Sequence, residues 1–144
     1  MRPISLILAL LLCLCLCPAA RAERETPEPE VFTNGDYTYI LLEDGTAEIT
    51  KYRGTVEDLV IPESLNSVPV TGIGDHAFSM RFNLTSVTIP DSVTTIDHSA
   101  FYRCPDLTVT VGHDSYAEKY CQDTGIQYIY SDSNDWLNNY DRDV

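Results

Sequence analysis

The stretch "IGDHAF" at residues 73–78 returns as "IDHSAF" at residues 96–101. Aligning Ala77-Phe78 with Ala100-Phe101 brings further apolar residues and prolines into the same order, namely Ile61-Pro62 with Ile89-Pro90, Ile73 with Ile96, and Leu84 with Leu107. The first copy carries five extra residues around "NSVPV". Because so many positions match in one order, the sequence indicates a single structural unit written twice, over residues 59–84 and 84–107.

Each unit contains two short β-prone pieces, such as residues 87–89 and 93–96, followed by a compact turn through the Ala-Phe pair. Alternation along "LTSVTI", with a local irregularity at Thr85-Ser86, directs Leu84, Val87 and Ile89 toward one side. Pro90, which lacks an amide donor, ends that strand. A unit of about 23 residues cannot bury its apolar side alone, so the copies must stack. The pattern predicts a mainly β protein, a short solenoid of about two coils.

The stretch "YTYILLEDGTAEITKY" at residues 37–52 has two β-prone runs around Asp44-Gly45, a dipeptide typical of tight hairpin turns. With that pair as a two-residue turn, Leu42 pairs with Ala47, Ile40 with Ile49, Tyr39 with Thr50 and Tyr37 with Tyr52. We therefore expect an N-terminal β-hairpin cap with one aliphatic face and one tyrosine-rich face. Tyr37, Tyr39 and Tyr52 are candidate binding residues for a protein or glycan, because tyrosine offers a rigid contact area with a polar tip. The alternative is that they only cover a half-exposed sheet.

The segments "LTSVTIP", "VTTI" and "AFYRCPDL" resemble the BspA-type leucine-rich repeat of secreted and surface proteins, chiefly bacterial. "DGTAEITKYRG" and "VPVTGIGDHAF" also look like the opening of such proteins, so the resemblance covers roughly residues 36–130. It implies a leucine-rich-repeat fold and contact with proteins or host surfaces, as in adhesins. One departure is Arg81, which stands where the second unit has Cys104.

The stretch "DSYAEKYCQDTGIQYIY" at residues 114–130 predicts a helix, with Ser115 and Glu118 as a capping box and Gly125 just past its end. Tyr116, Ala117, Tyr120 and Cys121 share one helical face. We expect this helix to cover the last coil and a strand at residues 126–130 to follow, which together form a C-terminal helix-strand cap. The domain then spans residues 34–130. An acidic tail follows at residues 131–144, where Trp136 with Leu137 is either a plug over the last coil or an exposed anchor for a partner.

The chain opens with features of a secretory signal peptide. Arg2 precedes an apolar run from Ile4 to Cys17, and Ala20 and Ala22 form the A-x-A pattern of a cleavage site. The run has 14 residues, whereas crossing a bilayer takes about 20. We assign residues 1–22 to the signal peptide and residues 23–33, rich in Pro and Glu, to a disordered spacer. A lipoprotein acylated at Cys13, Cys15 or Cys17 is the competing interpretation, although Leu precedes each of these cysteines.

Removal of 22 residues from the 144 leaves a mature chain of 122. It holds all 22 acidic residues and seven of the nine basic ones, so its net charge is about −15. This charge argues against binding to nucleic acid or to anionic membranes. Two cysteines remain, Cys104 and Cys121, too few for a disulfide-rich scaffold or a thiolate zinc site. We favour two free, buried thiols over a disulfide between them, since the resembling family often keeps the first as a core thiol.

The sequence lacks the common catalytic motifs, including G-x-S-x-G, a phosphate-binding glycine loop and H-E-x-x-H. His76 and His98 are offset in the repeat alignment and so are not expected to form a metal pair, and His113 falls in the turn before the helix. We expect no cofactor and no enzymatic activity. The leading hypothesis is a secreted protein that contacts proteins or host surfaces. The alternatives are a small spacer module or remnant of a longer repeat array, and an enzyme of unrecognised type.

The signal-peptide assignment predicts a secreted chain whose first residue is Glu23 and which lacks Cys13, Cys15 and Cys17. Intact-mass measurement of the exported protein checks this, because cleavage after Ala22 fixes the mass. A lipid-modified Cys17 at the N-terminus would contradict the prediction.

Overall fold

The structure is a computed structural model and describes residues 27–132. Its elements in chain order are β1 (Val31–Asn34), β2 (Tyr37–Leu41), β3 (Ala47–Tyr52), β4 (Asp58–Val60), β5 (Ser64–Leu65), β6 (Val68–Ile73), β7 (Ser86–Thr88), β8 (Thr95–Ile96), β9 (Thr108–Val111), α2 (Tyr116–Thr124) and β10 (Gln127–Tyr130). The predicted signal peptide at residues 1–22 and most of the tail, including Trp136 and Leu137, lie outside the described residues. Within residues 27–132, no helix has the length and apolar character needed to cross a membrane.

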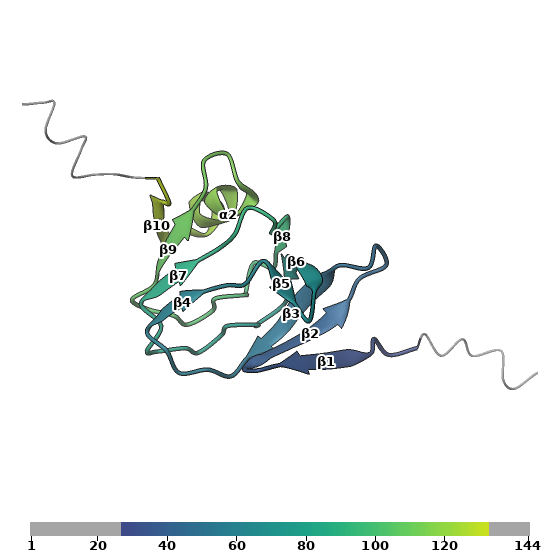
Figure 1. The fold of residues 1–144 in the computed structure, drawn as a ribbon. Helices are drawn as coiled ribbons and strands as arrows, with labels where there is room; N and C mark the ends of the chain where they lie inside the picture. The colour runs from purple at the N-terminus through teal and green to yellow at the C-terminus, as the bar shows by residue number, and fades with distance from the viewer. Residues whose placement is uncertain (1–26, 133–144) are drawn as a thin grey trace, which may run out of the picture.

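The repeats stack into two facing sheets (Figure 1). One sheet is wholly parallel and has the order β10-β9-β7-β4, so each repeat adds one strand beside the last. In the other sheet β6 lies between β3 and β8, again in parallel, and β1, β2 and β3 form an antiparallel extension. The chain passes from one sheet to the other within each repeat, which is the path of a solenoid.

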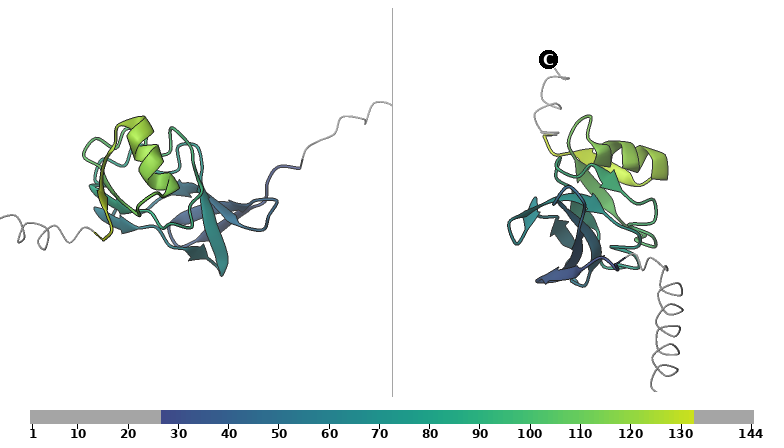
Figure 2. Two further views of the ribbon diagram at one scale, coloured as in Figure 1. Left: turned by 90° about the horizontal axis from the view of Figure 1, so that it is seen from above. Right: turned by 90° about the vertical axis from the view of Figure 1, so that its right-hand side faces the viewer.

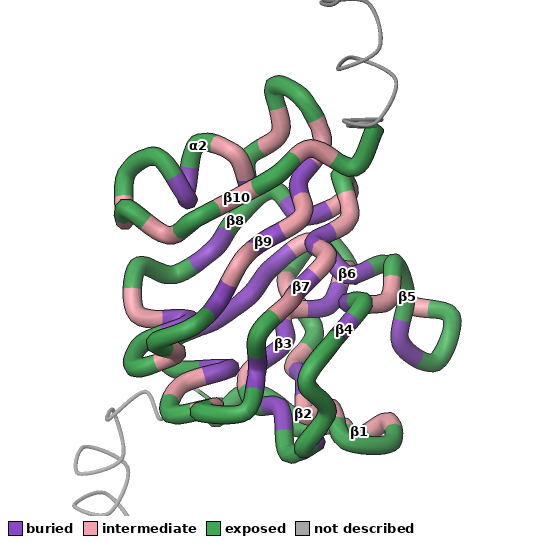
Figure 3. The backbone as a smooth tube through the Cα atoms, turned by 90° about the vertical axis from the view of Figure 1, so that its left-hand side faces the viewer, coloured by how far each residue is buried: buried purple, intermediate pink, exposed green. Residues whose placement is uncertain are grey.

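Buried side chains form straight rows because equivalent residues of successive repeats lie in register. Leu59 pairs with Val87 and Val87 with Val109 in the parallel sheet, and Ile49, Ile73 and Ile96 are joined in the same way in the other. Figure 3 shows buried positions alternating with partly exposed ones along β7 and β9, as expected for strands with one face in the core. The apolar residues that align between the two repeats are therefore the core.

A row of aromatic rings runs through this core from one end to the other. Tyr37 lies 5.0 Å from Tyr52, Tyr52 lies 5.4 Å from Phe78, Phe78 lies 5.1 Å from Phe101, and Phe101 lies 6.2 Å from Tyr120, measured between ring centroids. We call this row the aromatic ladder. The repeats supply its two phenylalanines, whereas the hairpin and the helix supply the tyrosines at its ends.

The predicted hairpin exists, but its register is wrong at most positions. The loop is wider than two residues: the Leu42 amide donates to the Thr46 carbonyl over 2.8 Å, and Asp44 accepts from the Thr46 amide and hydroxyl. The pairs are consequently Leu41 with Ala47, Ile40 with Glu48 and Tyr39 with Ile49. These pairs are shifted by one residue from the predicted register. A bulge between Thr38 and Tyr39 restores the predicted register beyond it, so the predicted pairing of Tyr37 with Tyr52 is confirmed.

Regular structure begins at Val31 and not at Asn34, so residues 31–33, assigned to the spacer, belong to β1. β1 pairs with β2 across a tight turn in which Gly35 has a φ of +56°, as the first central position of a type II′ turn requires. The Phe32 ring stacks on Tyr39 with a centroid distance of 5.5 Å. The sequence interpretation missed this strand because it took the Pro/Glu segment as continuing to the hairpin.

The five extra residues of the first repeat form a small hairpin of β5 with β6. Asn66 and Ser67 make its turn, and both have positive φ values, of 49° and 68°. The Asn66 side chain accepts a hydrogen bond from Asn34 over 2.7 Å and donates one to the Tyr39 hydroxyl over 2.9 Å. The insertion therefore ties the N-terminal strands to the first repeat.

The capping signals predicted for the helix are confirmed. The Glu118 amide donates to the Ser115 hydroxyl over 3.1 Å, and Gly125 adopts a left-handed φ of 75°. The Glu118 carboxylate reaches one residue further back than in a standard capping box and accepts from the Asp114 amide. Ala117, Tyr120 and Cys121 are buried, but Tyr116 is exposed and does not belong to that face, contrary to expectation. Figure 2 shows α2 lying across the end of the solenoid.

The aromatic ladder predicts a large stability difference between two phenylalanines four residues apart. Phe78 is 0% exposed, stacks on Phe101 and makes a tilted contact with Tyr52, so Phe78→Ala is expected to cost about 3–5 kcal/mol of unfolding free energy. Phe82 is 62% exposed, so Phe82→Ala is expected to stay within about 0.5 kcal/mol of the parent. Urea unfolding of both variants makes the comparison, and similar losses would refute the ladder as the core.

Candidate functional site

The turns that follow each Ala-Phe pair project side chains out of the solenoid. The Phe78 and Met80 amides donate to the Ala100 and Tyr102 carbonyls, both over 2.8 Å, so the two turns lie directly one on the other. Met80 and Arg103, which are equivalent in the two repeats, have left-handed φ values of 57° and 61°. This reversal sends the chain back toward the parallel sheet and leaves the residues around it facing solvent.

Four large apolar side chains are exposed on or beside these turns. Val56, Met80, Phe82 and Tyr102 are 46%, 56%, 62% and 53% exposed. Val56, Met80 and Phe82 line one groove of about 130 Å³ together with Tyr52 and Arg81. We call these four residues, with the basic residues Lys51, Arg81 and Arg103 beside them, the turn surface.

Arg81 is held in place at the wall of the groove. Its guanidinium donates to the Tyr52 carbonyl and lies 5.9 Å from the centroid of the Tyr52 ring. Its Nε is buried and makes no hydrogen bond. The equivalent Cys104 makes a similar contact one repeat later, since its Sγ donates to the Phe78 carbonyl over 3.1 Å. Arg81 thus occupies a core position of the repeat while its positive charge stays at the surface.

Two of the three tyrosines predicted as binding residues are in the core. Tyr39 is 2% exposed and Tyr52 is 3% exposed, and only Tyr37 is partly accessible. Burial, then the neighbouring Tyr52 and Asp36, raises the pKa of Tyr37 to about 12. The predicted tyrosine-rich outer face is wrong, because the one-residue slip in the hairpin turns Tyr39 inward beside Ile49. The fourth candidate, Trp136, lies outside the described residues.

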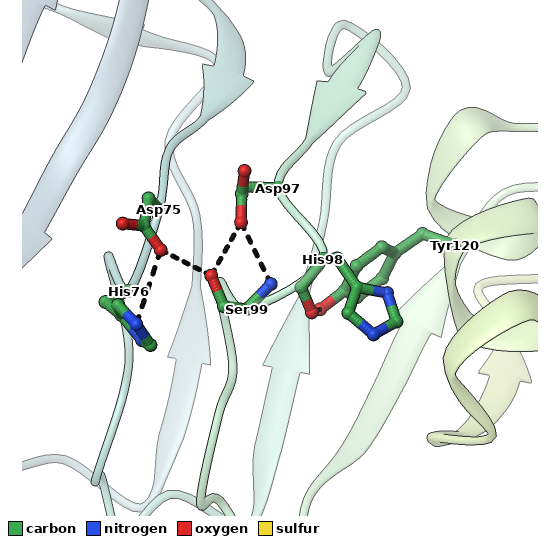
Figure 4. Close-up of polar contacts among 6 residues, drawn as sticks. All are labelled: Asp75, His76, Asp97, His98, Ser99 and Tyr120. Atoms are coloured by element: carbon green, nitrogen blue, oxygen red, sulfur yellow. Dashed lines mark hydrogen bonds and ion pairs between the residues drawn. The ribbon is translucent and has the colours of Figure 1, made fainter.

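The other polar cluster on the repeats stabilises a turn. The Ser99 hydroxyl lies within hydrogen-bond distance of both Asp75 and Asp97, at 2.5 and 2.6 Å, and its single proton reaches one of them at a time (Figure 4). Hydrogen bonds from the Ser99 hydroxyl and then its amide lower the pKa of Asp97. His76 lies beside Asp75, whereas His98 is on the other side of Ser99. Among residues 27–132, no three His, Cys, Asp or Glu side chains are placed to hold a metal ion.

Sequence reasoning missed Val56, Met80, Phe82 and Tyr102. A signal for two of them lies in the repeat alignment, where Ser79 stands opposite Tyr102 and Met80 opposite Arg103. At these positions one copy is polar and the other apolar, so the apolar side chain has no apolar equivalent to pack on in the other repeat. Large apolar residues at such positions are therefore candidates for the surface.

The family model of the BspA type leucine rich repeat region (6 copies) matches residues 47–121, which run from β3 into α2. The chain belongs to the BspA-type leucine-rich repeat family. This confirms the resemblance seen in the sequence and agrees with the stacked parallel strands. No curated protein shows a comparable match to the chain.

Two of the solved structures similar to this chain are bacterial leucine-rich repeat proteins. A leucine rich cell surface protein from Faecalibacterium prausnitzii A2-165 is 42% identical over 60% of this chain and 24% of its own, with a TM-score of 0.54. A leucine-rich repeat protein from Bacteroides capillosus ATCC 29799 is 32% identical over 57% of this chain and 70% of its own, with a TM-score of 0.50. The chain thus spans about a quarter of the length of the Faecalibacterium protein. The neighbours' family favours a protein-interaction module.

The cysteines of this BspA-type domain are both free thiols in the structure, Cys121 buried and Cys104 partly so. Their redox state in solution stays a prediction: the unreduced, denatured mature chain, which keeps two of the five cysteines, should be alkylated by two equivalents of iodoacetamide. Burial raises the pKa of Cys121 to about 11, so in the native protein its thiolate is scarce at pH 8 and alkylation should accelerate as the pH rises toward 11. Mass spectrometry after labelling checks both statements. Absence of labelling before reduction would show a disulfide.

Proposed function

We propose that this chain is a secreted, non-enzymatic leucine-rich repeat protein that binds other proteins, including host-surface proteins in the manner of an adhesin. The observation that carries the proposal is the turn surface, where Val56, Met80 and Phe82 line one groove and Tyr102 stands beside Met80. Exposed apolar side chains rimmed by charge are typical of interaction sites. Aromatic residues, Met and Arg are also the residue types enriched in protein interfaces.

The remaining features support a recognition domain over an enzyme. The groove holds no pairing of a nucleophile with a base: of the residues that line it, Arg81 and Tyr52 are the titratable ones. The predicted signal peptide supports export, and the negative net charge supports a protein or neutral glycan partner over nucleic acid. About two coils, closed by the hairpin at one end and the helix and strand at the other, form a rigid base for the turns.

A spacer module without a partner is the competing function. If the protein is such a spacer, removal of the exposed apolar side chains of the turn surface has no effect on binding to any other protein. The two functions therefore differ in what happens when these side chains are removed from a protein that still folds.

Replacing Met80 and Phe82 by Ser is expected to reduce capture of partner proteins by the immobilised mature chain at least tenfold, because a few large side chains dominate most interfaces. The matched control replaces Val60 and Ile129, which are 71% and 50% exposed but lie on β4 and β10. The immobilised variants are incubated with a mixture of host-matrix and secreted proteins, and the captured proteins are measured by quantitative mass spectrometry. Thermal melting of each variant confirms that it folds. Equal capture by the parent and the turn variant, or equal loss in the control, would reject the turn surface as the binding site.

A further inference from the structure

The basic side chains of the domain are concentrated at the turn surface. Residues 27–132 contain five Lys and Arg residues, and three of them belong to it: Lys51, Arg81 and Arg103. Lys51, Met80 and Arg81 line one shallow depression, and the Arg103 guanidinium lies 5.5 Å from the centroid of the Tyr102 ring. The chain as a whole has a net charge of −13, so this distribution is strongly uneven.

These three cations have no carboxylate partners within the described part of the chain. Both ion pairs found there involve histidine, His76 with Asp75 and His113 with Asp132. Asp75, the acidic residue that lines the same depression as Lys51, is already bonded to Ser99 and lies beside His76. Positive charges left unpaired in an acidic protein form a surface complementary to carboxylates of a partner.

The groove beside the cations fits an apolar side chain. Its volume of about 130 Å³ is close to the roughly 150 Å³ of an apolar cavity that holds a benzene ring. Val56, Met80 and Phe82 supply apolar walls, and the Arg81 guanidinium lies at one wall, fixed by the Tyr52 carbonyl. A ligand that fills the groove therefore places its neighbouring groups next to a positive charge.

We infer that the turn surface binds an acidic segment of a partner protein, which inserts one aromatic or aliphatic side chain into the groove and pairs its flanking carboxylates with Lys51, Arg81 and Arg103. This inference rests on the proposed function and adds the chemistry of the partner. A sulfated glycan would satisfy the cations but has no apolar side chain to cover Phe82 and Val56, and so fits the surface less completely.

The test titrates the mature chain with synthetic twelve-residue peptides, read out by fluorescence anisotropy of a labelled peptide. The first peptide has a central Leu-Trp pair flanked by Asp and Glu; the second has Asn and Gln in place of every acid; the third has Ala in place of Leu-Trp. The first is expected to bind at least tenfold more tightly than the other two. Raising the salt concentration from 50 to 500 mM should weaken its binding, because the charges are exposed.

Variants then locate the binding. Lys51→Gln with Arg103→Gln is expected to weaken binding of the acidic peptide at least tenfold, whereas Lys119→Gln, the matched loss of a cation elsewhere, is expected to leave it unchanged. Arg81 is kept, since its contact with Tyr52 gives it a part in folding. Phe82→Ser should weaken binding as strongly, and Val60→Ser should not.

Three outcomes would overturn the inference. Equal binding of the acidic and the neutral peptide would remove charge recognition. Binding of a heparin oligosaccharide, but of no peptide, with the same dependence on Lys51 and Arg103 would assign the surface to anionic glycans. Binding of a peptide of residues 131–144 in preference to the designed acidic peptide would assign it to a second copy of this chain. If captured proteins still depend on Met80 and Phe82 while the acidic peptide fails to bind, the partner chemistry is wrong and the proposed function stands.

Discussion

Five aromatic rings, contributed by β2, β3, the two repeat turns and α2, contact one another in one row through the core. Each contact lies between 5.0 and 6.2 Å, and aromatic pairs of this kind contribute about 0.5–1.5 kcal/mol beyond the area they bury. The row is continuous only if every turn places its ring at the same height above the previous one. Hydrogen bonds from Tyr52 to Ala77 and from Phe78 to Ala100 set that height. The stacking of the coils, the fit of both caps and the position of the turns all follow from it.

Two tyrosines of the ladder, Tyr120 from the helix and Tyr52 from the hairpin, show what tyrosine contributes beside the repeats. The Tyr120 hydroxyl reaches the edge of the core and donates to the His98 carbonyl over 3.2 Å, so the ring is buried without leaving a polar group unpaired. Tyr52 takes the place of a repeat phenylalanine, and its hydroxyl lies where a side chain on residue 54 would stand: a Cβ there would be 1.9 Å away. Gly54 is therefore part of the ladder, because the chain can pass the ring only without a side chain.

The repeats, the helix with its caps and the family could be predicted from the sequence because each depends on neighbouring residues in the chain. The hairpin register could not, since a two-residue turn at Asp44-Gly45 and the observed wider loop suit the same dipeptide. Tertiary packing favours the wider loop, because this register buries Tyr39 and Tyr52 in the core. The bulge between Thr38 and Tyr39 is the local irregularity that this register requires. β1 was missed for a similar reason: Val31 and Phe32 form a strand only because β2 offers a free edge. The turn surface depends on bringing residue 56 next to residues 80–82 and 102, which no local pattern predicts.

The residues that stabilise the repeats and the residues that the turns expose occupy different positions of the repeat. Positions in register between repeats, such as Phe78 and Phe101, are constrained to pack, so they cannot vary without cost to the core. The residues just after them lie outside the rows and differ between the copies, as Ser79 and Tyr102 or Met80 and Arg103 do. A solenoid can therefore change what its turns display while the rings beneath stay the same. In this short domain the two turns lie side by side, and Lys51 lines the same depression as Met80 and Arg81 of the first turn, so the exposed apolar and basic side chains gather in one corner of the domain.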